Sequence, residues 1–172
     1  RFSYFDQTSK PYFEPRLAVN YKLNNKLTFK AATGKYYQFA NRVMREDVLS
    51  GSRDFWILSD GNNIPVSSAT HYILGASYET HQYIFSAEYY YKDLKGVTEY
   101  SLRFNPSRGG VSYEENFLNG IGYAQGIEFL LQKKIGHYNG WISYSIGEAR
   151  NKIHAYSPNY YSESKDVGHE LK

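Results

Sequence analysis

The sequence predicts an all-β protein, an interior section of an antiparallel transmembrane β-barrel. Three observations support this prediction. Side chains alternate between apolar and polar with period 2, a pattern that a strand separates onto two faces. Short turns alternate with long connections, as in barrels that have tight turns at one rim and long loops at the other. Aromatic residues are abundant, with 19 Tyr, 10 Phe and 2 Trp among 172 residues.

The composition excludes several classes of protein. The chain has no Cys, which excludes a disulfide scaffold, a zinc finger and a thiol enzyme. Its net charge is +3, and positive and negative residues are interspersed along the chain. The sequence therefore lacks the concentrated basic patch that is typical of nucleic-acid-binding proteins. The longest apolar run, residues 55–58 (FWIL), is far shorter than the roughly 20 residues of a transmembrane helix. No targeting signal is visible at the N-terminus. The C-terminus stops just after a turn-rich stretch, and we expect a segment of a larger protein.

The first predicted hairpin joins residues 17–23 to residues 27–32 through the three-residue loop 24–26. Opposing Leu23 with Leu27 pairs Tyr21 with Phe29 and brings the apolar residues of both strands onto one face. Within the loop, Asn25 is a residue type that tolerates a left-handed conformation.

The second predicted hairpin turns at residues 81–82. One face of it is apolar or aromatic, with the expected pairs Tyr78 and Phe85, Ala76 and Ala87, Leu74 and Tyr89, and Tyr72 and Tyr91. The other face is polar or small, with Ser77 opposite Ser86, Gly75 opposite Glu88, and Glu79 opposite Ile84.

The third predicted hairpin turns at Gly136 and His137, where Gly suits the mirror-image turn of two-residue hairpins. Its apolar face pairs Leu131 with Ile142, Phe129 with Tyr144, and Ile127 with Ile146. Its reverse face pairs Glu128 with Ser145, Leu130 with Ser143, Gln132 with Trp141, and Lys134 with Asn139. This second face is again mostly polar.

The connections between these hairpins are long, at residues 39–70, 96–123 and 155–172. Residues 97–104 alternate as well, so we expect strands to project beyond the membrane there. Tyrosines gather toward both ends of the strands, as in the aromatic girdles of barrels. The expected girdle near the short turns is Tyr21, Tyr78, Tyr83 and Tyr138, and that near the long loops is Tyr36, Tyr37, Tyr72, Tyr89 and Tyr91.

Two environments are compatible with the apolar faces. Against a second sheet they would form the core of a soluble, secreted β-sandwich, which would bind glycans through exposed aromatics such as Trp56 and Trp141. Against lipid they would form a barrel wall with a polar lumen. The residues expected to line that lumen are Lys22, Lys30, Ser77, Glu79, Ser86, Glu88, Glu128 and Gln132.

Several segments resemble barrel strands of the TonB-dependent outer-membrane receptors, in the style common in Bacteroidetes. These segments are residues 14–21 (EPRLAVNY), 27–38 (LTFKAATGKYYQ), 64–66 (IPV), 71–75 (HYILG), 88–94 (EYYYKDL) and 122–128 (GYAQGIE). The resemblance covers residues 1–171, and it depends on the order and spacing of motifs that are weakly specific singly.

The resemblance implies a barrel of about 22 strands around an N-terminal plug, neither the plug nor the final strands being within this sequence. It also implies an outer-membrane location, contact with lipid, and import of a scarce nutrient such as a ferric siderophore, haem, cobalamin or a glycan. Energy would come through the TonB complex, and a surface lipoprotein partner is left open. The resemblance predicts neither an enzyme nor a resident cofactor.

The long connection at residues 39–70 contains the expected ligand-binding candidates, Arg42, Arg45, Arg53 and Trp56, a mixture suited to anionic or planar ligands. No metal site is expected, because the five histidines are scattered without metal-ligand spacing. No nucleophile elbow or zinc motif is present. Residues 120–126 (GIGYAQG) superficially match a dinucleotide loop, but the third glycine is late and strand entry is the better interpretation. A barrel enzyme remains a third alternative.

Overall fold

The computed structural model describes residues 1–47, 51–100, 117–155, 157–162 and 169–171. In these residues the chain forms antiparallel strands, apart from one 3-10 turn, η1 (Asp6–Thr8). The predicted all-β, antiparallel architecture is therefore confirmed. Among the same residues, no helix is both long and apolar enough to cross a membrane.

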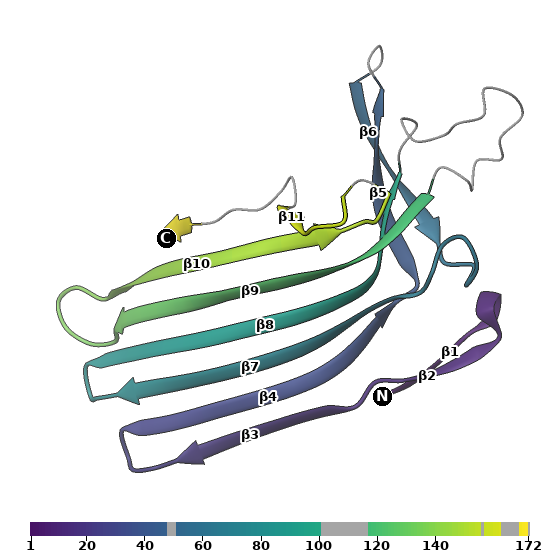
Figure 1. Ribbon diagram of the computed structural model, residues 1–172. Helices are drawn as coiled ribbons and strands as arrows, with labels where there is room; N and C mark the ends of the chain where they lie inside the picture. The colour runs from purple at the N-terminus through teal and green to yellow at the C-terminus, as the bar shows by residue number, and fades with distance from the viewer. Residues whose placement is uncertain (48–50, 101–116, 156, 163–168, 172) are drawn as a thin grey trace, which may run out of the picture.

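One large twisted sheet dominates the molecule (Figure 1). Six of its strands lie side by side in chain order: β3 (Arg16–Lys22), β4 (Leu27–Gln38), β7 (Ser67–Glu79), β8 (Tyr83–Tyr100), β9 (Phe117–Lys133) and β10 (Gly140–Lys152). The short strands β11 (Tyr161–Ser162) and β12 (His169–Leu171) both pair with the far edge of β10. In the part of the chain that the structure describes, β3 pairs with β4 alone, so the sheet is open at that edge.

The three hairpin registers predicted from alternation are confirmed. Tyr21 pairs with Phe29 in the first hairpin, and Tyr78 pairs with Phe85 in the second. In the third, Leu131 pairs with Ile142. A slip of one residue would have exchanged the two faces of every strand, so these pairs fix which side chains share a face.

Two turns differ in detail from what the sequence suggested. Asn25 is not left-handed, because Ser9 is the one non-glycine residue with positive φ in the described chain. The loop is closed instead by the side chain of Asn24, whose Oδ1 accepts hydrogen bonds from the backbone N–H groups of Lys26 and Leu27, both at 2.8 Å. The third turn is longer than expected, since the ladder ends with Lys133 opposite Gly140, before the predicted pair of Lys134 and Asn139.

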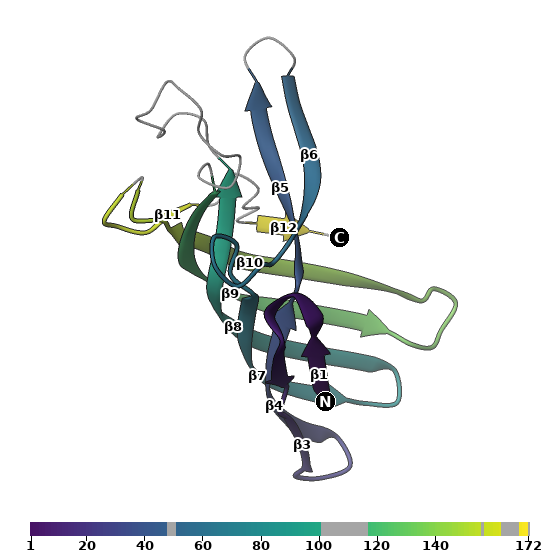
Figure 2. The same ribbon diagram turned by 90° about the vertical axis from the view of Figure 1, so that its right-hand side faces the viewer.

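The first long connection is largely a hairpin rather than a loop. β5 (Ala40–Asp47) and β6 (Gly51–Leu58) form a separate two-stranded sheet that rises away from the large sheet (Figure 2). Residues 64–66, which resembled a barrel strand, are not in a strand, and β7 begins after them. The predicted strand extension beyond residue 96 is present as far as Tyr100, after a bulge at Gly96, and residues 101–104 lie outside the described part.

A third small sheet, β1 (Phe2–Phe5) with β2 (Lys10–Phe13), lies beside the end of β4. Its aromatic residues pack on Phe39, with ring centroids of Phe5 and Phe39 at 4.5 Å and of Tyr12 and Phe39 at 5.1 Å. These ring contacts hold the small sheet against the end of the large sheet from which the long connections leave. Between β2 and β3, the carbonyl oxygen of Pro15 accepts a hydrogen bond from the backbone N–H of Lys35.

The buried core is small and lies outside the middle of the large sheet. Val43 and Ile57 of the β5 and β6 hairpin are buried with Ile64 and Phe117, and Phe55 and Tyr100 pack against them. This cluster joins the hairpin to the extended ends of β8 and β9. The central strands of the large sheet, in contrast, keep their large apolar side chains exposed.

Candidate functional site

Four rows of side chains, running across the strands, form one face of the large sheet, which we call the apolar face. From the short turns upward the rows are: Leu27, Tyr78, Phe85, Leu131, Ile142; then Tyr21, Phe29, Ala76, Ala87, Phe129, Tyr144; then Val19, Ala31, Leu74, Tyr89, Ile127, Ile146; then Leu17, Thr33, Tyr72, Tyr91, Gln125, Glu148. Many of these side chains are exposed, including Leu17 at 65%, Leu74 at 61% and Ile142 at 60%. A contiguous apolar surface of this size marks a site of interaction.

Polar rows bound the apolar face at both ends. Beyond the last row lie Lys35, Asp93 and Arg150, and at the short turns Lys133 lies opposite Tyr83. The stretch of β8 from Tyr83 to Asp93 is about 34 Å long at about 3.4 Å per residue. Tilted by about 40°, it spans about 26 Å, close to the roughly 25 Å of the apolar band of outer-membrane barrels.

Tyrosines gather on the apolar face beside the long connections. The rings of Tyr91 and Tyr123 are stacked at 6.1 Å, and Tyr160 meets Tyr123 edge-on at 5.3 Å. The hydroxyl of Tyr123 donates to Glu148 Oε1 at 3.3 Å, and Gln125 Nε2 donates to the same oxygen at 2.8 Å. Tyr123 therefore offers an apolar body and a hydrogen-bonded tip, the chemistry of an interfacial residue.

The structure changes the membership of this predicted girdle. Tyr37, Tyr72, Tyr89 and Tyr91 share the apolar face, but Tyr36 lies on the opposite face, in register with Ala69. The reason is the strict alternation of β4, which places neighbouring residues on opposite sides. Tyr123 and Tyr160 were missed, because both lie in segments that the sequence presents as long connections.

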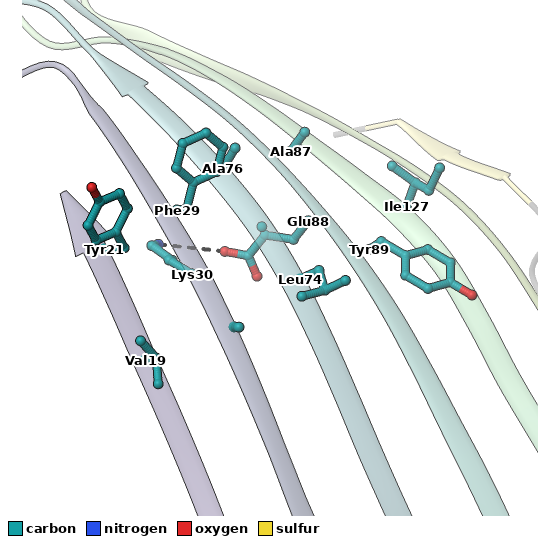
Figure 3. Close-up of a pocket in the computed structure, with 12 residues that line it drawn as sticks. Val19, Tyr21, Phe29, Lys30, Leu74, Ala76, Ala87, Glu88, Tyr89 and Ile127 are labelled. Carbon is teal, nitrogen blue, oxygen red and sulfur yellow. Dashed lines mark ion pairs between the residues drawn. The ribbon is translucent and has the colours of Figure 1, made fainter. Parts of the chain in front are cut away.

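A shallow hollow of about 440 Å³ lies in the apolar face (Figure 3). Small residues, Ala31, Ala76 and Ala87, line it together with larger side chains such as Phe29 and Tyr89. Its lining is mostly apolar, and its charged members are Lys30 and Glu88, which form an ion pair with each other.

The other face of the sheet, the polar face, carries all eight residues predicted for the lumen: Lys22, Lys30, Ser77, Glu79, Ser86, Glu88, Glu128 and Gln132. Lys30 Nζ lies 3.6 Å from Glu88 Oε1, and the pair crosses β7 at Gly75 (Figure 3). Lys134 Nζ donates to Glu79 Oε1 at 2.6 Å. The sheet thus separates an apolar side from a polar side that carries the ion pairs Lys30–Glu88 and Lys134–Glu79.

The polar face also contains a stack that the sequence did not predict. The guanidinium carbon of Arg16 lies 4.3 Å from the centroid of the Tyr36 ring, and that ring lies 4.5 Å from the ring of His71. Arg16 is held by Glu14, a buried carboxylate 3.1 Å from Arg16 Nη2. Alternation in the sequence places Arg16, Tyr36 and His71 on the same face of the sheet. It does not show that they are neighbours, because that depends on how the strands are paired.

The predicted ligand-binding residues all lie on the β5 and β6 hairpin. Arg42 pairs in register with Trp56, and Arg45 with Arg53 farther along the hairpin. The structure thus brings Arg42 and Trp56 directly opposite each other, with Trp56 69% exposed. The side chains of Arg45 and Arg53 lie outside the described residues. Within the described ranges, no group of three His, Asp or Glu side chains is arranged to hold a metal ion.

Comparisons with known proteins give no match to any family model, to any curated protein or to any solved structure. The class that the geometry defines is therefore an open antiparallel sheet with one apolar and one polar face.

Proposed function

We propose that the chain forms part of the wall of an outer-membrane β-barrel, with its apolar face toward lipid and its polar face toward the lumen. The observation that carries this proposal is the exposed apolar band, about 26 Å tall when tilted and bounded by tyrosines and charges. The chain exposes 12076 Å², whereas a compact globular protein of 20.0 kDa exposes about 8,700 Å². In the proposed assembly, lipid covers the exposed apolar face.

The open edges of the sheet support a barrel larger than this chain. The outer edge of β3 and the far side of β11 and β12 carry backbone groups that lipid cannot satisfy. In the proposed assembly they pair with further strands, to a total of about 22, as in the TonB-dependent receptors that the sequence resembles.

Within that class, we propose a non-enzymatic receptor that imports a scarce nutrient with energy from the TonB complex. The residues on the polar face, Lys22, Lys30, Glu79, Glu88, Glu128 and Gln132, would line the lumen around a plug. The projecting hairpin of β5 and β6 would meet the nutrient outside the membrane, since loops at this rim carry recognition in such barrels. A surface lipoprotein would be a further partner.

Cysteine labelling tests the membrane orientation, because the chain has no native Cys. Single cysteines at Leu74, Phe129 and Ile142 on the apolar face are compared with matched cysteines at Ser77, Ser86 and Ser143 on the polar face. The protein is reconstituted in vesicles and treated with a lipid-phase and a water-phase thiol probe. Lipid-phase labelling of the first set alone is expected. Protection of Leu74, Phe129 and Ile142 from both probes would mean a packed protein core and a soluble sandwich.

A further inference from the structure

The outer face of the β5 and β6 hairpin presents an apolar platform beside an ion pair. Trp56 lies in register with Arg42, and Asp54 and Leu58 are two residues before and after Trp56 on the same face of β6. Trp56 is 69% exposed and Leu58 is 60% exposed. We call these four residues, Arg42, Asp54, Trp56 and Leu58, the Trp56 platform.

The opposite face of the hairpin holds the platform in place. Val43 is 3% exposed and Ile57 is 8% exposed, and both pack with Ile64 and Phe117. Phe55 meets Tyr100 edge-on at 5.6 Å. A surface fixed in this way loses little conformational entropy when a ligand binds, which favours affinity from few contacts.

The charges of the platform determine which ligand chemistry it suits. Arg42 Nη2 donates to Asp54 Oδ2, so the guanidinium is already paired with a carboxylate on this face. An anion approaching Arg42 would also approach Asp54, which repels it. A neutral ligand with hydroxyl groups instead uses both partners, accepting from Arg42 and donating to Asp54 through charge-assisted hydrogen bonds.

We propose that the Trp56 platform binds a neutral glycan. The C–H face of a pyranose ring lies on the indole and on Leu58, and vicinal hydroxyls bond to Arg42 and Asp54. The proposal rests on the receptor function and names the class of nutrient that the receptor captures. It excludes the anionic ligands that the arginine content of this segment first indicated.

The chain contains two tryptophans, so replacing one leaves the other as a fluorescent reporter of its own position. Two matched variants therefore test the platform. Trp141→Phe keeps Trp56 as the fluorescent reporter. Trp56→Phe keeps Trp141, which is 56% exposed at the short-turn end of β10 and serves as the control. Each variant of the protein, in lipid nanodiscs, is titrated with maltoheptaose, cellohexaose and mannohexaose. Haemin and a heparin hexasaccharide serve as anionic probes, and acrylamide quenching is measured.

At least one neutral oligosaccharide is expected to shift Trp56 emission to the blue and to protect Trp56 from acrylamide, while Trp141 is unaffected. Asp54→Ala in the Trp141→Phe background should then weaken the Kd about tenfold, because a charge-assisted hydrogen bond is lost. Protection by haemin or heparin alone, equal protection of both tryptophans, or no protection by any probe would overturn the proposal. Protection by a neutral glycan together with absence of lipid labelling at Leu74 would keep the platform and reject the barrel.

Discussion

The phenolic oxygen of Tyr90 lies 2.7 Å from the point that a Cβ atom would occupy at Gly126. The same oxygen lies 2.8 Å from the equivalent point at Gly147, the next residue of the same row on the polar face. The absence of two side chains therefore lets the Tyr90 ring lie across β9 and β10. Tyr36 lies over Gly34 in a similar way, with its ring 3.1 Å from the point of a Cβ there.

Gly126→Ala is expected to destabilise the sheet by about 1 to 3 kcal/mol, because the new methyl group overlaps the Tyr90 ring and the carbonyl oxygen of Ile146. The measurement is the free energy of unfolding in urea, with the protein folded into lipid vesicles. Gly140→Ala is the matched control, since nothing lies within 4 Å of its Cβ position. Equal stability of the two variants would contradict this packing.

Asn24→Ala is expected to cost about 1 kcal/mol, since two backbone N–H groups of the first turn lose the acceptor that closes it. Asn25→Ala is the control, because Asn25 has neither these bonds nor a left-handed backbone. Its change should stay within about 0.5 kcal/mol. If Asn25→Ala were the more damaging of the two, the turn would have the left-handed form that Asn25 tolerates.

Lys30 and Glu88 are expected to be coupled weakly across Gly75. Their side chains are 46% and 40% exposed, so the pair is screened, and a coupling of about 0.2 to 1 kcal/mol is expected. A double-mutant cycle with Lys30→Met and Glu88→Gln, measured at low salt and at 1 M salt, checks this value. Coupling that persists unchanged at 1 M salt would indicate a pair shielded from water.

Val43→Ala is expected to loosen the hairpin of β5 and β6 by about 2 kcal/mol, because it opens a cavity where the hairpin joins β8 and β9. Amide hydrogen exchange should become faster in β5 and β6 and stay unchanged in β4 and β7. Leu58→Ala removes a larger but exposed side chain and should change exchange little. Faster exchange throughout the large sheet would show that the hairpin and the sheet unfold together.

The large sheet was predictable because two local signals agreed. The alternation of apolar and polar residues predicted which side chains share a face of the sheet. The length of the loops predicted which residues pair across neighbouring strands, as the pair of Tyr21 and Phe29 shows. The details of the turns were not predictable, since side-chain hydrogen bonds such as those of Asn24 compete with backbone preferences.

The candidate site was predicted less fully than the sheet. The hairpin of β5 and β6 has the continuous apolar run 55–58, in which Trp56 and Leu58 are exposed and Ile57 is buried. In a run of four apolar residues, the sequence shows no alternation between apolar and polar positions, so the strand was not recognised. The sequence therefore indicated a loop with scattered arginines. The ion pair of Arg42 with Asp54, from which the proposed glycan preference is argued, depends on the register of two strands that had not been recognised.

The order of the strands in the large sheet has a consequence for how the molecule assembles. From β3 to β10 each strand pairs with the next strand of that sheet along the chain, and β5 and β6 form a side branch between β4 and β7. Each hairpin needs only local loop closure, and the edge it leaves is a template for the hairpin that follows. We therefore expect the sheet to grow sequentially. In the proposed barrel, the costly pairing of strands that are distant in sequence is postponed to the seam at β3.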